Sequence, residues 1–268
     1  MRKFKYFKNI TPTSADIYIY GDIVDDSTDW WTGKKDAFNV DPLDLKEELD
    51  ELQGVKELNI YINSGGGSVF ASSTMTNMFR RFREQNNATI NAYVDGLCAS
   101  ASTYLLMVAD NVNIYDNSIV MIHKPMTFTF GNANDLAKDI ELLDSIENDL
   151  MLPMYMAKAT VSEDEIKELI ANETWFNGNS DSDLYLGNYF NINHLEESKQ
   201  AVACSSLLLN KYNHTPKALA EPKDEAKEKG TDNLKIVNSD KVPENNKPDQ
   251  SKEADNSLYN YRLRLLDL

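Results

Sequence analysis

The sequence contains few of the residues that disulfides, metal sites and membrane spans require. Its 268 residues include two cysteines, Cys98 and Cys204, and three histidines. The cysteines are far apart and no histidine pair has ligand spacing, so we expect no disulfide framework, no metal and a reducing compartment. No apolar run approaches the ~18–20 residues of a membrane helix, and the polar start "MRKFKYFKNI" is unlike a signal peptide. These features predict a cytoplasmic protein, or one packed into an assembly that forms there.

Positive charge is also scarce. The chain has 27 Lys and Arg against 43 Asp and Glu, which gives a formal net charge of −16. Nucleic-acid binding depends on clustered Lys and Arg, so we expect neither a nucleic-acid nor a membrane partner. The excess of acidic residues lies within the first 210 residues.

Composition divides the chain into three parts. Residues 1–209 alternate apolar and polar segments and predict one folded domain. Residues 210–257 are rich in Pro, Lys, Glu, Asp and Asn and have too few large apolar residues to form a core, so we expect a disordered linker. Residues 258–268, "LYNYRLRLLDL", form a short apolar end that is either a docking peptide or a terminus without a role.

Hydrophobic periodicity predicts strands and helices in alternation through the first domain. We expect strands over 15–23, 57–63, 89–96, 111–116 and 118–123, and helices over 41–52, 68–84, 99–109, 134–160, 162–170 and 195–209. Asp41 and Ser162 are the expected caps of two helices, and Pro153 is expected to kink the long one. Such alternation is typical of an α/β fold with a mainly parallel core.

Two turns between a strand and a helix could hold a site. "NSGGG", residues 63–67, places three glycines before a helix, where the backbone can approach a ligand closely. It has neither the Lys-Ser/Thr of a P-loop nor the dinucleotide fingerprint, and we expect no cofactor. "VDGLCASAST", residues 94–103, brings Ser100 and Ser102 to the start of the next helix. There a serine is usually a packing or capping residue, but either one could also be a nucleophile.

A nucleophilic serine needs a base. His214 lies in the low-complexity part and His194 at the expected start of a helix, whereas His123 ends an apolar strand beside a loop. His123 is therefore the best candidate, although such a histidine is more often structural. A carboxylate should orient it, but the sequence has too many acidic residues for spacing to select one. Composition does not exclude a glycosidase that uses a pair of carboxylates, but no local feature of the sequence favours one.

Four ordered blocks, "INSGGGSVF", "VDGLCASASTYLLM", "SIVMIHKP" and "NETWF", resemble the proteolytic subunit of the Clp protease. They are more similar still to its phage relatives, the head-maturation proteases of tailed bacteriophages. The resemblance covers about residues 17–192. It implies stacked βα units of the ClpP/crotonase type, a protruding handle helix over the long predicted helix, and assembly into a closed homo-oligomeric ring.

The resemblance also implies the site residues. The family's nucleophile falls on Ser100 and not on Ser102, its histidine on His123, and its acid on Glu173. Its oxyanion donors are backbone N–H groups that fall on Gly66 and Ala101. The sequence departs from the main Clp pattern twice: Gly65 replaces a proline, and Glu173 replaces an aspartate, as in the phage-like branch.

These residues imply a serine endopeptidase that acts on proteins or peptides. The first expected role is processing of capsid or scaffold proteins during phage head maturation, in the host cytoplasm or inside the prohead. One alternative is a degradative Clp-type subunit that works with a separate ATPase, and another is a non-catalytic scaffold ring. A crotonase-type acyl-CoA enzyme would share the fold but has no reason to place Ser100 and His123 where they are.

Overall fold

The computed structural model describes residues 5–28, 31–36, 38–195 and 212–215, all within a unit that spans Met1–Glu221. The predicted helix 195–209 lies almost entirely outside the described residues. So do most of the predicted linker and the whole of the apolar end, 258–268.

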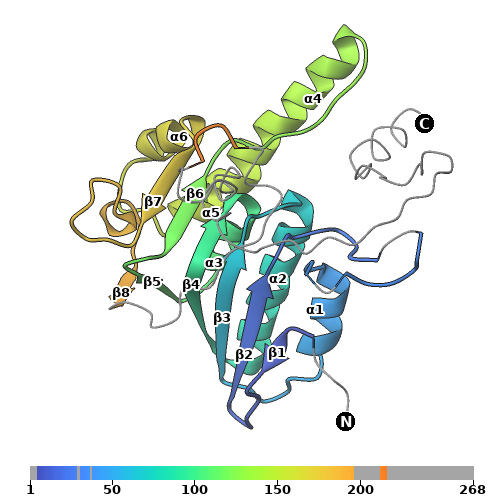
Figure 1. Cartoon of the computed structure of the whole chain (residues 1–268), viewed down its shortest axis with the longest axis vertical. Coiled ribbons are helices and arrows are strands. Elements are labelled where there is room, and N and C mark those ends of the chain that lie inside the picture. The colour runs from blue at the N-terminus through green and yellow to red at the C-terminus, as the bar shows by residue number, and fades with distance from the viewer. Residues whose placement is uncertain (1–4, 29–30, 37, 196–211, 216–268) are drawn as a thin grey trace, which may run out of the picture. The chain divides into compact units, whose positions relative to one another are not determined.

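The strands form a mainly parallel sheet, as the alternating pattern predicts (Figure 1). Its order is β1-β2-β3-β4-β5-β8, with β6 paired to β4 and β7 paired to β6. Only the β1–β2 and β6–β7 pairs are antiparallel within the described part of the chain. The strands are β1 (Phe7–Lys8), β2 (Ser14–Tyr20), β3 (Glu57–Ser64), β4 (Thr89–Ala99), β5 (Asn111–Tyr115), β6 (Ile119–Ile122), β7 (Thr174–Asn177) and β8 (Asn193–Leu195).

Helices follow the strands, and most of them, though not the one over Ala133–Ser145, bury one face. They are α1 (Pro42–Leu49), α2 (Val69–Asn86), the 3₁₀ turn η1 (Ser100–Ser102), α3 (Thr103–Met107), α4 (Ala133–Ser145), the π-helical turn η2 (Ile146–Met151), α5 (Leu152–Met156), α6 (Glu163–Ala171) and the 3₁₀ turn η3 (Leu186–Asn188). The predicted caps are confirmed: Asp41 accepts a hydrogen bond from the Asp44 N–H, and Ser162 from the Glu165 N–H. Each cap satisfies one of the first N–H groups, which have no acceptor inside the helix.

Strand β4 extends beyond the predicted turn at Gly96. Its first half pairs with β5 through Asn91–Val94, and its end pairs with β6 through Leu97–Ala99. The predicted turn at Gly96 was therefore wrong, whereas the predicted helix 99–109 is present over residues 100–107 as η1 and α3. After Gly96 the backbone groups of β4 hydrogen-bond to β6 instead of β5. The strand therefore continues to Ala99, and a short helical stretch follows.

The long predicted helix forms a projecting arm. It runs as α4, η2 and α5 and ends at Met156 rather than Thr160, with Pro153 in the first turn of α5 after a π-helical turn. A π-helical turn already leaves some backbone groups without their usual helical partners. A proline, which has no N–H to donate, is therefore tolerated directly after it. In Figure 1, α4 points away from the sheet, and no residue of α4 is buried.

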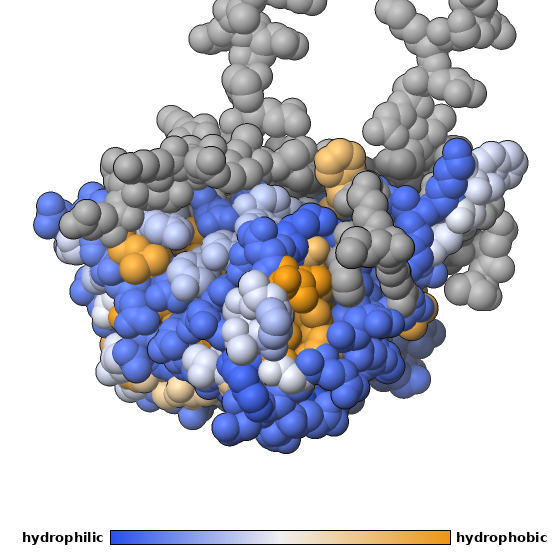
Figure 2. Space-filling view, turned by 90° about the horizontal axis from the view of Figure 1, so that it is seen from below, coloured by the Kyte–Doolittle hydropathy of each residue, from blue (hydrophilic) through white to orange (hydrophobic). Residues whose placement is uncertain are grey.

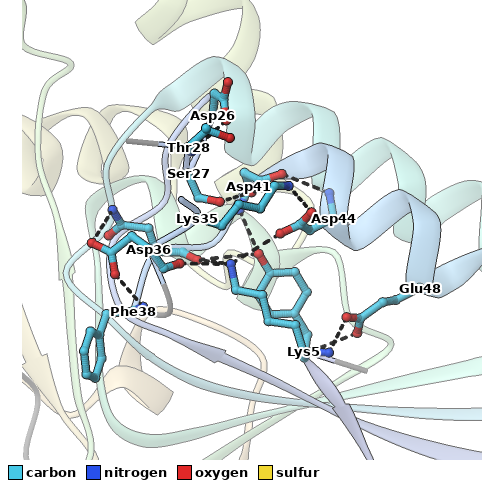
Figure 3. Close-up of polar contacts among 12 residues, drawn as sticks. Lys5, Asp26, Ser27, Thr28, Lys35, Asp36, Phe38, Asp41, Asp44 and Glu48 are labelled. Carbon is cyan, nitrogen blue, oxygen red and sulfur yellow. Dashed lines mark hydrogen bonds and ion pairs between the residues drawn. The ribbon is translucent and has the colours of Figure 1, made fainter. Parts of the chain in front are cut away.

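A polar cluster ties the start of the chain to α1 (Figure 3). Both carboxylate oxygens of Glu48 accept backbone N–H groups, from Lys5 and from Tyr6 and Phe7 at 2.9 and 3.1 Å. Lys35 forms ion pairs with Asp41 and Asp44 in the same cluster. The short strand β1 is therefore held at the sheet edge by a buried side chain as well as by its pairing to β2.

The surface seen in Figure 2 is mostly hydrophilic, with hydrophobic residues gathered in small separate areas. None of the helices in the described residues is long and apolar enough to cross a membrane.

Candidate active site

Ser100 stands where strand β4 ends and the next helical turn begins. Its Oγ lies 2.7 Å from Nε2 of His123, within hydrogen-bond distance. Its backbone has φ +55°, in the left-handed region that a serine adopts only at a cost. Residues held in such conformations cluster at functional sites, because the surrounding structure must enforce them. Ser100 therefore has the position and the partner of a nucleophile.

Ser102 is not available for this role. It is fully buried, and its hydroxyl donates to the carbonyl oxygens of Ala99 at 2.7 Å and Ser64 at 3.2 Å. These bonds tie the first helical turn to strand β3. The residue pattern alone leaves the choice between the two serines open, and this geometry favours Ser100 as the candidate nucleophile.

His123 follows β6 and is 7% exposed. Burial lowers the pKa of its imidazole below the usual value, and the nearby charge of Glu173 raises that pKa in part. The lowered pKa favours the neutral ring, which is the form that a general base must have. His194 lies in β8, where it pairs with Asp116, and not at the helix start that the sequence predicts.

Glu173 lies between α6 and β7 with a left-handed backbone, φ +49°. Its carboxylate accepts N–H groups from Asn213 at 2.9 Å, His214 at 2.5 Å and the Trp175 indole at 3.3 Å. Burial would raise its pKa, but these hydrogen bonds and the neighbouring His123 outweigh burial, so the pKa is lowered overall. Within the described residues no hydrogen bond joins Glu173 to His123; they interact through charge.

The glycine loop approaches the nucleophile as closely as the sequence suggests. A Cβ on Gly66 would lie 2.8 Å from Cβ of Ser100 and 3.0 Å from N of Ala101. The Ala101 N–H belongs to the first helical turn, whose amides have no acceptor within the helix. The Gly66 N–H, however, donates to Oγ of Ser64 at 3.1 Å.

The other side of the glycine loop is held by Ile23. Ile23 N–H donates to the carbonyl of Gly66, and Ser68 N–H donates to the carbonyl of Ile23, so Gly67 and Ile23 form a parallel bridge. These bonds fix the loop in the position in which Gly66 lies against Ser100.

Sequence reasoning missed the segment Tyr212–Thr215. It falls in the predicted linker, yet Tyr212 is 9% exposed and its ring lies edge-on to His123, with centroids 5.0 Å apart. His214, set aside as a base, contributes its backbone N–H to Glu173. No periodicity marks these residues, and the buried tyrosine is the one apolar signal that the sequence offered.

A serine beside a neutral histidine, with a carboxylate behind it and backbone amides in front, can attack a carbonyl group and stabilise the resulting oxyanion. In the residues that the structure describes, no cluster of His, Cys, Asp and Glu could hold a metal ion. The positions of Ser100, His123 and the backbone amides support acyl transfer through the serine hydroxyl.

Comparison with known proteins places these residues in a family. The family model described as Clp protease matches residues 47–184, about half of the chain, and this range contains Ser100, His123 and Glu173. The ATP-dependent Clp protease proteolytic subunit of Bacteroides fragilis is 36% identical over 96 residues, which are 35% of this chain and 42% of the relative. That of Bacteroides thetaiotaomicron is also 36% identical over 96 residues, 35% of this chain and 40% of the relative. The chain spans about two fifths of the length of these relatives.

Proposed function

Because the chain belongs to the Clp protease family, we propose that it is a serine endopeptidase that cleaves peptide bonds with Ser100, His123 and Glu173. The observation that carries the proposal is the 2.7 Å contact between Oγ of Ser100 and Nε2 of His123. A buried neutral imidazole at this distance can accept the hydroxyl proton as the oxygen attacks. Protein and peptide substrates are the proposed partners, with no cofactor.

The proposed reaction proceeds through an acyl-enzyme. Oγ of Ser100 bonds to the peptide carbonyl carbon while His123 takes its proton, and the carbonyl oxygen becomes an oxyanion. His123 then gives the proton to the leaving amine nitrogen, and water repeats the sequence to release the acid. The charge of Glu173 stabilises the imidazolium formed at each step.

The proposed oxyanion donors are the N–H of Ala101 and an amide of the glycine loop. The N–H of Gly66 becomes available to the oxyanion when Oγ of Ser64 releases it. Removal of one such donor typically costs about 2.7–4 kcal/mol of transition-state stabilisation.

A fluorophosphonate probe tests the activity without a known substrate. We expect a phosphonyl adduct at Ser100 by mass spectrometry, lost in Ser100→Ala and in His123→Ala and retained in Ser102→Ala. Ser102→Ala is the matched control because it removes a nearby hydroxyl with no contact to His123. An adduct at Ser102 instead of Ser100 would rule out the assignment of the nucleophile. No adduct in any oligomeric form would favour the scaffold-ring alternative.

The proposed physiological role is processing of capsid or scaffold proteins during phage head maturation. Its support is the Glu173-Thr174-Trp175 sequence, which resembles the phage-like branch. In this role the protein acts in the host cytoplasm or prohead interior, and cleavage needs no ATPase. Cleavage of a co-expressed capsid or scaffold protein by the wild type and not by Ser100→Ala, without ATP, is the expected result.

A degradative Clp-type subunit is the second candidate, because both relatives are ATP-dependent Clp protease proteolytic subunits. It requires a separate ATPase to deliver unfolded chains. Degradation of a folded test protein only when a Clp ATPase and ATP are present would select this role over the first.

We further propose that the subunits form a closed ring and that the protease domain, expected over 1–209, also includes Tyr212–Thr215. The exposed apolar residues of α4, Leu136, Ile140 and Leu142, support contacts between copies. Light scattering should give an oligomeric mass at micromolar concentration, and a monomeric mass would exclude the ring.

A further inference from the structure

We propose that Tyr212–His214 is a positioning segment that holds Glu173 and the glycine loop in place for catalysis. The segment is the orange stretch near β7 and α6 in Figure 1, and it lies after the range matched to the Clp protease family. This inference rests on the proposed peptidase function, and it makes the reactivity of Ser100 depend on residues outside the matched range.

The first contact is with the acid. Asn213 N–H donates to Oε2 of Glu173 and His214 N–H to Oε1, so two adjacent amides bind both carboxylate oxygens. A carboxylate has about four acceptor sites, so these bonds and the one from Trp175 leave room for a further donor. Hydrogen bonds to the ionised form keep it charged, and a pair of them fixes the plane of the group.

The second contact is with the rest of the site. The Tyr212 ring packs edge-on against His123 and also against Trp175, whose ring centroid lies 5.9 Å away. Its hydroxyl donates to the carbonyl oxygen of Gly65, the residue before the loop amides, at 2.5 Å. One side chain thus bridges the base and the glycine loop.

Tyr212 also completes a small core. It packs with four buried residues on the adjoining strands β4, β6 and β7: Leu97, Ala99, Met121 and Trp175. Burial of the ring excludes water from the neighbourhood of His123 and Glu173. In a drier environment the attraction between the carboxylate and the forming imidazolium is stronger.

The segment supports the site and does not block it. Oγ of Ser100 hydrogen-bonds to His123, and no hydrogen bond from Tyr212–Thr215 reaches Ser100 in the described structure. The segment binds Glu173 and the carbonyl side of the loop, whereas the attacking oxygen remains free of it. A blocking peptide would instead occupy the nucleophile or the oxyanion donors.

Substitutions at Asn213 separate the backbone amide from the side chain. Asn213→Pro removes the N–H that donates to Glu173, and Asn213→Ala keeps it. We expect Asn213→Pro to lower the first-order inactivation rate of Ser100 by a fluorophosphonate about tenfold or more, as for loss of one hydrogen bond to a charged group. The concentration for half-maximal inactivation and the melting temperature should stay unchanged, and Asn213→Ala should stay within about twofold of wild type.

Three results would overturn the proposal. Equal rates for the two variants would show that the amide has no role, a faster rate for Asn213→Pro would show that the segment inhibits, and a matching fall in melting temperature would show a merely structural contact. Tyr212→Phe is the second test: it keeps the ring contacts and loses the bond to Gly65, so it should be less impaired than Tyr212→Ala.

Hydrogen exchange separates failure of this proposal from failure of the peptidase function. The amides of Asn213 and His214 should exchange slowly in the wild type and quickly in Glu173→Ala. Fast exchange in the wild type would overturn the docking itself. Slow exchange without any probe adduct at Ser100 would overturn the peptidase function, and the positioning role with it, while the docking stands.

Discussion

Two buried glutamates in this molecule hold a distant part of the chain by its backbone. Glu48 accepts the amides of Lys5, Tyr6 and Phe7, and Glu173 accepts those of Asn213 and His214. The two side chains are almost equally buried, at 6% and 7% exposure of the residue. In each place a carboxylate satisfies N–H groups that would otherwise be costly to bury.

The regions differ in what surrounds the carboxylate. Glu48 lies on the regular helix α1 beside a cluster of lysines and aspartates (Figure 3). Glu173 has a left-handed backbone and faces His123. The same contact is therefore expected to support folding in the first region and catalysis in the second. Substitutions that affect one quantity and not the other test this distinction.

The largest expected effect is from Glu173→Gln. Loss of the charge behind the base should lower the inactivation rate of Ser100 about 10³–10⁴-fold, as for amide replacement of a triad acid. The matched change in the other region, Glu48→Gln, should leave the rate within about twofold. The inactivation rate of Ser100 by the probe is measured in both variants. A similar loss of rate in both would show that the two regions do not differ in their effect on catalysis.

A second expected effect comes from Gly66→Ala. A Cβ there would lie 2.6 Å from the carbonyl oxygen of Ala99, at φ +93°, so the loop must move away from Ser100. A displacement of about 1 Å costs on the order of 10²-fold in rate. Gly54→Ala is the control, because Gly54 has φ +85° with open space around it, and should cost stability alone. An unchanged inactivation rate in Gly66→Ala would contradict the assigned place of the loop.

Glu48→Ala should act on stability. It leaves the buried amides of Tyr6 and Phe7 without their acceptor, which we expect to lower the free energy of unfolding by about 2–3 kcal/mol. Asp50→Ala, which breaks an exposed ion pair with Lys46, should change it by less than about 1 kcal/mol. Denaturant unfolding measures both. A loss of Ser100 reactivity in folded Glu48→Ala would show that the two regions are coupled.

The smallest expected effect is on pH dependence. His123 must be neutral to accept a proton, and burial lowers its pKa. The inactivation rate should therefore persist as the pH falls through about 6.5 and decline only below it. The charge of Glu173 raises the pKa of His123, so in Glu173→Gln the remaining rate should decline at a still lower pH. A midpoint above 6.5 in the wild type would contradict the buried, neutral base.

The sequence predicts much of the fold because strands and helices alternate with clear periodicity. It indicates His123 as the best candidate base because that residue ends an apolar strand. It indicates Ser100 and Ser102 as candidate nucleophiles because both follow a strand in a run of small residues, and the choice of Ser100 comes from the family resemblance. It does not select Glu173 without a family resemblance, since spacing cannot choose among so many acids. The continuation of β4 through Gly96 depends on a change of partner strand, which is a tertiary effect that no local pattern encodes.

Local sequence patterns also cannot predict that Tyr212–His214 docks beside Glu173. Its hydrogen bonds to Glu173 come from backbone amides, which every residue except proline carries. Its side-chain signal is one tyrosine in a polar stretch, and burial of that ring depends on a small core built from three strands. Composition describes the stretch as a whole and cannot mark the one residue, Tyr212, that packs into the small core.

Ser100 and Glu173 share the left-handed backbone with Asn9 and Asn87 among the described residues that are not glycine. Asparagine tolerates that conformation, whereas serine and glutamate pay about 1 kcal/mol or more for it. Glycine would relieve the strain at Ser100, whereas at Glu173 it would also remove the acceptor of the Asn213 and His214 amides. A lineage released from the need to cut peptides would therefore gain stability by replacing Ser100 with glycine, but it would lose stability by replacing Glu173 in the same way.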